Sequence, residues 1–282
     1  MKKVTLGYIC FSRTLDGEDK LFAKLAKKKK IKLIVFNLAK KLSEEEVEEK
    51  AEQCDIVFNN SVESIALELV KTLEELGKKV IENSEAYYYT EDKWMFYLKC
   101  KEHNLPTPNT ILLSTNIATA KKELLEFKHW PVVLKRIEGE EGRFVEKANN
   151  IDEATEVIKN LCDKGVERLP IIAQEFIKSH SYRVTVVGDK IMQAALKDAY
   201  GWKATGVYDW HIDKFPVDKE LEKLVKKIVK VCKLNVCGID FLKKEDKWVL
   251  LEINAEPAYD FFEKEKEHLI SEILDLLKKK TK

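Results

Sequence analysis

Three oxygen-bearing side chains interrupt two apolar segments near the C-terminus. Asp240 lies in GIDFL, and Glu252 and Asn254 lie in VLLEIN, on either side of a charged turn. Side chains alternate between faces along a strand, so Glu252 and Asn254 are expected to share a face with Trp248 and Leu250. Asp240 comes within cross-strand reach if the two segments pair as a hairpin. Two carboxylates and an amide oxygen suit Mg²⁺, whose remaining ligands phosphate oxygens can supply.

A second interpretation of this hairpin stays open. The sheet could simply have one polar face, on which Asp240 and Glu252 pair with lysines. Charged residues already fill the turn, and the flanking segments are strongly apolar, which favours the metal site.

A second segment, PVVLKRIEGEEGRFVEKA (131–148), combines a lysine with a glycine-containing loop. An apolar strand ends at Lys135, and Gly139 and Gly142 then allow the chain to reverse. Glycines let backbone N–H groups approach phosphates closely, and the lysine adds a positive charge. The loop also contains glutamates, which repel phosphates, and an ordinary hairpin loop is the alternative.

A third segment, PIIAQEFI (170–177), is typical of a buried strand. Its end, from Gln174 to Ile177, could present backbone amides and apolar side chains to an adenine ring. An ordinary core strand has the same composition, so this segment alone does not distinguish the two.

The composition restricts the class of protein. The 282 residues include 50 Lys and Arg and 49 Asp and Glu, which gives a net charge of +1. A nucleic-acid-binding protein usually has a basic excess, so no nucleic-acid partner is expected.

No apolar stretch reaches the ~18 residues of a membrane span, so no membrane association is expected. Lysine and glutamate are abundant and arginine is scarce, a thermophile-like composition.

The six cysteines are scattered along the chain without paired spacing. This distribution favours free thiols in a reducing compartment rather than a disulfide framework. The sequence therefore predicts a cytoplasmic protein.

The order of the predicted elements divides the chain into three parts. Residues 1–88 alternate strands and helices, the pattern of a wound parallel α/β domain, although no G-x-G-x-x-G follows the first strand. Residues 89–175 are expected to form a small α+β lobe that contains the glycine loop. Residues 176–282 are mostly strands, with helices, and predict a lobe with an antiparallel sheet. The expected fold class is therefore α/β combined with α+β.

Taken in order, these motifs resemble the ATP-grasp superfamily, and most closely the RimK-type carboxylate–amine ligases. Further segments that look like this family are EDKWMFYLKCKEHNLPTP, SYRVTVVGDK, CGID and LEINAEP. The resemblance covers residues from about 90 to 265. It implies the ATP-grasp fold, with the glycine loop closing over the phosphates of ATP.

The resemblance also implies a reaction. A carboxylate attacks the γ-phosphoryl group of ATP to form an acyl phosphate, and an amine then attacks this intermediate to form an amide. The implied cofactors are ATP and Mg²⁺, with two ions and with Mn²⁺ as a substitute. The implied partners are small-molecule or peptide carboxylate and amine substrates, with glutamate or another amino acid as one of them. The implied assembly is a homo-oligomer, either a dimer or a tetramer.

Individual residues follow from the same resemblance. Asp240, Glu252 and Asn254 would hold the Mg²⁺ ions, and Arg183 and Lys203 would act in catalysis. The residues implied around ATP are Lys93, Lys135, Gly139, Gly142, Gln174, Glu175, Phe176, Ile177, Ser181, Lys203 and Thr205.

Three positions depart from the family pattern. Ser181 stands where an acid usually contacts the ribose, Phe144 replaces a loop glycine, and Ala258 replaces a glycine. The aromatic-rich segment 200–215 could shape an acceptor pocket or form an ordinary hairpin. An ATP-grasp kinase and an ATP-binding regulator without catalysis remain the alternative functions.

Overall fold

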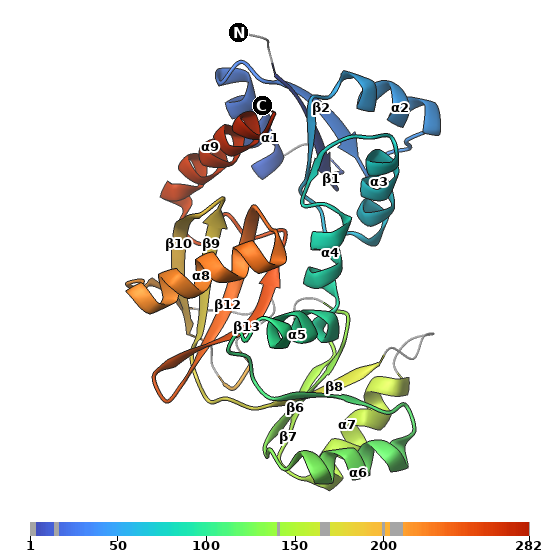
Figure 1. The fold of residues 1–282 in the computed structure, drawn as a ribbon, viewed down its shortest axis with the longest axis vertical. Helices are drawn as coiled ribbons and strands as arrows, with labels where there is room; N and C mark the ends of the chain where they lie inside the picture. Colours follow the sequence, from blue (N-terminus) through green and yellow to red (C-terminus); the bar gives the residue numbers. More distant parts are fainter. Residues whose placement is uncertain are drawn as a thin grey trace.

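Three β-sheets form the framework of the protein in a computed structural model (Figure 1). The structure describes residues 4–13, 17–139, 142–163, 170–198, 201–203 and 211–281. The strands are β1 (Thr5–Cys10), β2 (Lys32–Asn37), β3 (Ile56–Asn59), β4 (Val80–Ile81), β5 (Thr110–Leu113), β6 (Val132–Arg136), β7 (Val145–Ala148), β8 (Ile171–Glu175), β9 (Ser181–Val187), β10 (Lys190–Asp198), β11 (His211–Lys214), β12 (Val236–Lys244) and β13 (Lys247–Asn254). The helices are α1 (Gly17–Lys28), α2 (Glu44–Gln53), α3 (Ser64–Glu75), α4 (Ser84–Glu91), α5 (Lys93–Glu102), α6 (Ile117–Phe127), α7 (Ile151–Asp163), α8 (Lys219–Cys232) and α9 (Glu263–Lys280).

The N-terminal sheet is parallel, with the strand order β2-β1-β3-β4. One face packs on α2 and α3 through side chains such as Val47 and Leu73. The other face packs on α1 and on the C-terminal helix α9, whose Ile270 and Ile273 are buried in the same core (Figure 1). The wound parallel α/β fold expected for the N-terminal part is confirmed, but the contribution of α9 was not predicted.

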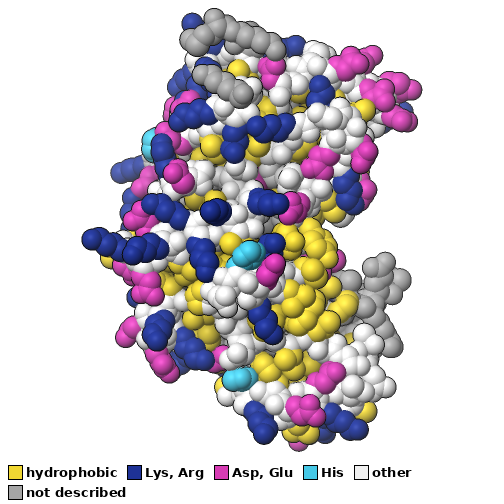
Figure 2. All heavy atoms as spheres, viewed as in Figure 1, with side chains coloured by type: hydrophobic (Ala, Val, Ile, Leu, Met, Phe, Trp, Pro, Cys, Tyr) yellow, Lys and Arg dark blue, Asp and Glu magenta, His cyan; other side chains and the backbone are white. Residues whose placement is uncertain are grey.

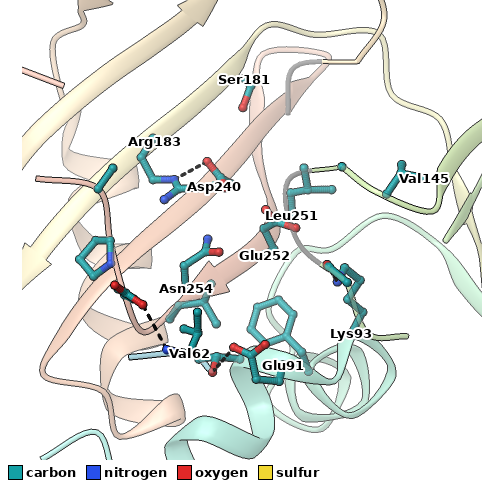
Figure 3. Close-up of a pocket in the computed structure, with 18 of the residues that line it drawn as sticks. Val62, Glu91, Lys93, Val145, Ser181, Arg183, Asp240, Leu251, Glu252 and Asn254 are labelled. Carbon is teal, nitrogen blue, oxygen red and sulfur yellow. Dashed lines mark hydrogen bonds and ion pairs between the residues drawn. The ribbon is translucent and has the colours of Figure 1, made fainter. Parts of the chain in front are cut away.

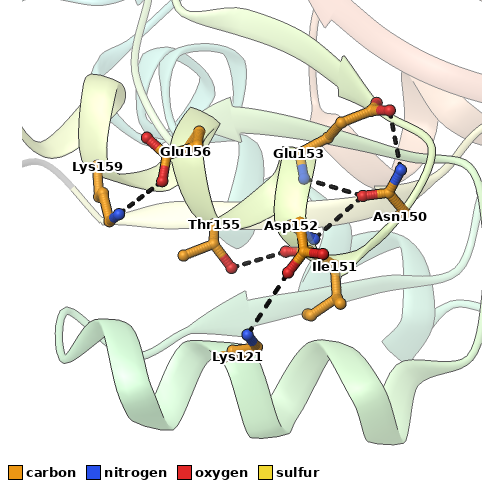
Figure 4. Close-up of polar contacts among 8 residues, drawn as sticks. All are labelled: Lys121, Asn150, Ile151, Asp152, Glu153, Thr155, Glu156 and Lys159. Carbon is orange, nitrogen blue, oxygen red and sulfur yellow. Dashed lines mark hydrogen bonds and ion pairs between the residues drawn. The ribbon is translucent and has the colours of Figure 1, made fainter.

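A second, antiparallel sheet has the order β5-β8-β6-β7 and packs against α6 and α7. The Asn150 side chain accepts hydrogen bonds from the backbone N–H groups of Asp152 and Glu153 at the start of α7 (Figure 4). Lys121 of α6 lies 3.8 Å from Asp152. An exposed ion pair adds little stability, so the shared apolar core holds this lobe together.

The third sheet is antiparallel, with the order β11-β10-β9-β12-β13. One face is apolar and packs on α8 and α5, through side chains such as Ile228 and Phe96. The opposite face carries polar side chains that include Arg183 and Asp240. The expected combination of α/β and α+β architecture is confirmed, whereas the boundaries between the three parts stay a prediction.

The surface mixes positive and negative side chains over the face shown in Figure 2. Apolar atoms gather there at the level of α4 and α5, where Tyr88 and Leu98 are exposed. Within the described ranges of the chain, no helix is long and apolar enough to cross a membrane.

A buried acid, Glu82, links the first sheet to the third. Its side chain accepts hydrogen bonds at Oε1 from the backbone N–H groups of Asn235 (3.0 Å) and Val236 (2.8 Å), at the start of β12. Its other oxygen has no hydrogen-bond partner among the described residues. Burial raises the pKa of Glu82 from 4.5 to about 8, even though these hydrogen bonds and Lys280 lower it in part. The carboxyl group therefore keeps its proton at neutral pH.

This proton makes stability depend on pH. Between pH 4.5 and about 8 the folded protein retains a proton that the unfolded chain releases, so the free energy of unfolding should fall as the pH rises. Glu82→Gln removes the titration, and this variant should be more stable than the wild type at pH 8 by on the order of 1–3 kcal/mol. Urea denaturation at several pH values measures the difference. Glu85→Gln, an exposed change in α4, should keep the wild-type slope, and parallel curves for wild type and Glu82→Gln would contradict the assignment.

Candidate active site

A cavity of about 530 Å³ lies between the polar face of the third sheet and the glycine loop (Figure 3). It receives side chains from α5 and β6 on one side and from β9, β10, β12 and β13 on the other. The predicted site residues that line it are Lys93, Lys135, Gly139, Gly142, Ser181, Arg183, Asp240, Glu252 and Asn254. Motifs that are far apart in the sequence thus meet in one cavity.

A β-bulge decides which hairpin side chains face this cavity. Asp240 of β12 pairs with Glu252 of β13, whereas the next residue, Phe241, pairs with Leu250. Leu251 is therefore the extra residue, and the alternation of faces shifts by one position at this point.

The bulge corrects one prediction. Trp248 and Leu250 lie in the apolar core under α8, while Glu252 and Asn254 face the cavity. The expectation that these four side chains share a face was wrong, because it assumed a regular strand.

Asp240 is the centre of a buried ion cluster, with its side chain 2% exposed. Arg183 donates from Nε to Oδ1 at 2.6 Å and from Nη2 to Oδ2 at 2.5 Å, and Lys197 donates from Nζ to Oδ1 at 3.0 Å. Burial alone would raise the pKa of Asp240, but the two cations outweigh it and hold the pKa well below its usual range. Asp240 is thus paired with a lysine, as the polar-face interpretation expected, and also with an arginine.

Gly238 leaves the space that Arg183 occupies. A Cβ atom at this position would lie 2.6 Å from Nη1 and 3.1 Å from Cδ of Arg183. A larger residue would push the guanidinium group away from Asp240. This clearance is a physical reason for glycine in the GID segment.

The oxygen atoms beside this cluster fit a hard divalent cation. Among the described residues, Oδ1 of Asp240 accepts two hydrogen bonds, but Oδ2 accepts only the one from Arg183 and retains acceptor capacity. The Glu252 carboxylate lines the cavity, and Asn254 donates through Nδ2 to the Gly238 carbonyl at 3.5 Å, which leaves its own oxygen as an acceptor. Oxygen ligands of this kind suit Mg²⁺.

The amide of Asn254 is a necessary part of this ligand set. Over the described stretches of the chain, no group of three or more His, Cys, Asp or Glu side chains could hold a metal ion. On the polar face of β12 and β13, the candidate oxygen ligands are two carboxylates, Asp240 and Glu252, and the amide of Asn254.

Two lysines face the glycine-loop side of the cavity. Asp92 caps α5 by accepting hydrogen bonds from two backbone N–H groups, which places Lys93 at the first position of the helix. Lys93 then donates from Nζ to the Gly139 carbonyl at 2.7 Å. Lys135, which is buried, donates from Nζ to Oε1 of Gln174 at 2.8 Å. Both ammonium groups are thereby anchored beside the loop.

The side-chain oxygen of Gln174 accepts the hydrogen bond of the Lys135 ammonium group and so fixes its position. Its Nε2 donates to the Thr110 hydroxyl at 3.1 Å, so its Oε1 is oriented toward Lys135. The pKa of Lys135 is lowered from 10.5 to about 8, chiefly by burial and in part by Lys93, although Glu252 and Asp240 oppose this. Gln174 was expected near the adenine; it lies in a smaller cavity beside the main one, together with Lys135.

The strand end expected to bind adenine is already engaged. The backbone N–H of Glu175 donates to the Asn109 carbonyl at 2.8 Å, and that of Phe176 donates to the Pro131 carbonyl at 3.2 Å. These two N–H groups are therefore not available to a ligand in this conformation. The Phe176 ring contacts Trp202 edge-on, with ring centroids 6.2 Å apart.

Three further predicted residues are not among the described residues that line the main cavity. Ile177 is buried, and Lys203 places its Nζ 5.9 Å from the centre of the Trp202 ring. Thr205 lies outside the described residues. The roles given to these residues from the sequence stay predictions.

The cavity also has an acidic part, lined by Glu18, Glu256 and Asp260. Burial raises the pKa of Glu18 and Asp260 raises it further, even though Lys266 lowers it. The backbone N–H of Val62, which follows β3, donates to Glu256 at 3.1 Å. The cavity thus combines a cationic part around Arg183 with an acidic part beside the N-terminal sheet.

Residues 90–277 match the family described as the RimK-like ATP-grasp domain. The chain belongs to this family. A probable alpha-L-glutamate ligase of Histophilus somni is 26% identical over 186 residues, which cover 64% of this chain and 60% of the relative. The match thus spans less than two thirds of that relative. An alpha-aminoadipate–LysW ligase, LysX, of Saccharolobus solfataricus is 27% identical over 195 residues, or 66% of this chain and 69% of the relative.

Superposition on solved structures identifies the fold. The crystal structure of a RimK domain ATP-grasp protein from Sphaerobacter thermophilus superposes with a TM-score of 0.77 at 15% identity. The superposition covers 97% of this chain and 99% of the other. The predicted ATP-grasp fold is confirmed.

Sequence reasoning missed two contributors to the site. Lys197 stands among small and apolar residues in QAALKD, and Thr110 precedes an apolar run. Their partners, Asp240 and Gln174, are 43 and 64 residues away in the chain. A lysine directly after the apolar run AAL was the available signal for Lys197.

The ion cluster predicts unequal effects of two neutralising changes. Asp240→Asn leaves two buried cations without their counter-charge and should lower the free energy of unfolding by about 3–5 kcal/mol. Glu252→Gln, on the paired strand, should cost less than about 1 kcal/mol. Urea denaturation measures both, and similar small losses would show that the cluster does not support the fold.

Proposed function

We propose that this protein is an ATP-dependent, ADP-forming ligase that joins a carboxylate to an amine through an acyl-phosphate intermediate. The observation that carries the proposal is the single cavity in which Lys93 and Lys135 meet Arg183, Asp240 and Glu252. Membership in the RimK-like ATP-grasp domain family supports it.

The cationic part of the cavity is the site for the ATP phosphates. Lys93 and Lys135 neutralise phosphate charge, and Gly139 and Gly142 let the loop backbone approach closely. Phosphoryl transfer depends mainly on positioning and charge neutralisation, which these groups supply.

Asp240, Glu252 and Asn254 would hold Mg²⁺, which when bound neutralises the charge on the transferred phosphoryl group. We propose Mg²⁺ as the resident ion, with room for two ions and with Mn²⁺ as a substitute. Arg183 keeps the Asp240 carboxylate oriented through two hydrogen bonds.

The reaction then follows in two steps. A substrate carboxylate oxygen attacks the γ-phosphorus of ATP, and ADP leaves. The amine nitrogen attacks the acyl carbon, the carbon–oxygen bond to phosphate breaks, and the nitrogen loses a proton. Arg183, in the wall of the cavity, stabilises the negative charge that develops on the tetrahedral intermediate and on the departing phosphate.

The substrates we propose are a small-molecule or peptide carboxylate and an amine, with glutamate or another amino acid as one of them. The relatives that carry glutamate or aminoadipate in their names support an amino acid. The acidic part of the cavity, with Glu256 and Asp260, favours a substrate that arrives as an ammonium ion. We propose a cytoplasmic location, which the six free cysteines support, and a dimer or tetramer.

Removing the charge of Glu252 tests the reaction. Glu252→Gln should lower carboxylate-dependent ADP release by at least ~100-fold, because one of the side chains that would hold the metal ion loses its charge. The assay combines Mg-ATP with a panel of carboxylate and amine pairs and identifies the product by mass. Glu245→Gln, an exposed change in the turn of the same hairpin, should retain full activity.

The outcomes of this assay separate the alternatives. An amide product supports the ligase. ADP release with a stable phosphorylated product and no amine requirement would identify a kinase. Nucleotide binding without turnover on any pair would point to a regulator. Full activity of Glu252→Gln would reject the metal assignment.

The buried ammonium of Lys135 predicts a pH effect on nucleotide binding. Because its pKa is lowered to about 8 by burial, Lys135 loses its charge as the pH rises above 8 in the free protein. ATP affinity should therefore be constant near pH 7 and fall up to tenfold per pH unit above 8. Calorimetry between pH 6.5 and 9.5 measures it, and Lys135→Met should bind ATP weakly without this decline. An unchanged wild-type affinity at pH 9.5 would contradict a role for the charged form.

A further inference from the structure

Lys197 has no role in the reaction described so far, yet it is among the most buried cations of the protein. Its side chain is 4% exposed and donates from Nζ to Oδ1 of Asp240. It lies on β10 opposite Ser181 of β9, and it lines the same cavity as Arg183. A buried lysine at this place must be balanced by a carboxylate, and Asp240 supplies it.

The hydrogen bonds at Asp240 are distributed unequally between its two oxygens. Oδ1 accepts hydrogen bonds from Lys197 and from Nε of Arg183, whereas Oδ2 accepts only the one from Nη2 of Arg183 within the part of the chain that the structure describes. Lys197 thus fills acceptor capacity on Oδ1, and the free acceptor capacity of Asp240 lies on Oδ2.

The charges around Asp240 also disfavour a cation that arrives alone. The cavity's basic side chains are Lys93, Lys135, Arg183 and Lys197. Its carboxylates are Glu91, Asp240 and Glu252, together with Glu18, Glu256 and Asp260 of the acidic part. Two of the cations contact Asp240 directly, so a divalent ion meets strong repulsion at this oxygen cluster. The phosphates of a nucleotide bring the negative charge that removes this repulsion.

We propose that Lys197 is a positioning residue that makes divalent-metal binding at Asp240 depend on bound nucleotide. With Arg183 it holds the carboxylate in place and balances its charge while the site lacks nucleotide. The metal then enters together with the phosphates rather than before them. The inference rests on the proposed function, in which Asp240, Glu252 and Asn254 hold the metal.

Mn²⁺ binding measured by electron paramagnetic resonance tests this role without any turnover. The wild-type protein should bind Mn²⁺ weakly alone and tightly with ADP. Lys197→Gln can still donate a hydrogen bond to Asp240 but removes the charge. This variant should bind Mn²⁺ in the absence of nucleotide about tenfold more tightly than the wild type. Equal or weaker nucleotide-free binding by Lys197→Gln would overturn the proposal.

Two further variants control for charge and for folding. Lys197→Arg retains the charge and should keep the wild-type dependence on nucleotide. Lys190→Gln removes an exposed lysine of the same strand, which pairs with Glu272, and should leave Mn²⁺ binding unchanged. If Lys197→Gln does not fold, the Lys197→Arg protein still decides the question, because nucleotide-independent Mn²⁺ binding by this variant would contradict the charge argument.

The same titrations separate this inference from the proposed function. Glu252→Gln with ADP should lose the tight Mn²⁺ site. If it keeps that site, the metal assignment itself fails. If it loses the site while Lys197→Gln behaves like the wild type without nucleotide, only the role of Lys197 fails.

Discussion

The buried charge of Asp240 is the constraint on which the site depends. A carboxylate this far from water is stable only beside cations, and its partners come from two other strands of the same sheet. Antiparallel pairing places Asp240 directly opposite Arg183 on β9 and opposite Glu252 on β13. A slip of one residue in either pairing would turn a charged side chain into the apolar core under α8. The energetic need to pair Asp240 therefore also maintains the register that the proposed chemistry requires.

Two irregular features make this arrangement possible. Gly238 gives the Arg183 side chain room to cross the strand and reach Asp240. The bulge at Leu251 lets Glu252 face the cavity while Leu250 and Ile253 both reach the apolar core. A regular strand with the same sequence could not satisfy both faces. The irregularity is therefore a consequence of building a polar site on a sheet whose other side is buried.

The sequence predicted what local patterns and the order of motifs can encode. It indicated the three sheets' general character, the fold and the positions of Lys135, Arg183 and Asp240 in one site. It did not predict the bulge, because alternation assumes a regular strand. It also did not predict that Lys197 contacts Asp240 or that α9 completes the N-terminal core, because both depend on the packing of segments that are distant in the chain. For the Phe176 segment, the sequence could not show that the backbone N–H groups are already paired.

The separation of charge within the cavity follows from the way the N-terminal sheet is joined to the rest. Acidic groups beside the proposed phosphate site would oppose nucleotide binding, so the position of Glu256 matters. The backbone of Val62, after β3, holds Glu256 through a hydrogen bond, and Tyr259 donates to Asn60 at 2.6 Å in the same region. With α9 packed against that sheet, the segment after β13 is fixed at both ends. The N-terminal sheet thus contributes to the cavity by fixing where the acidic part lies, although Lys93 and Lys135 come from other elements.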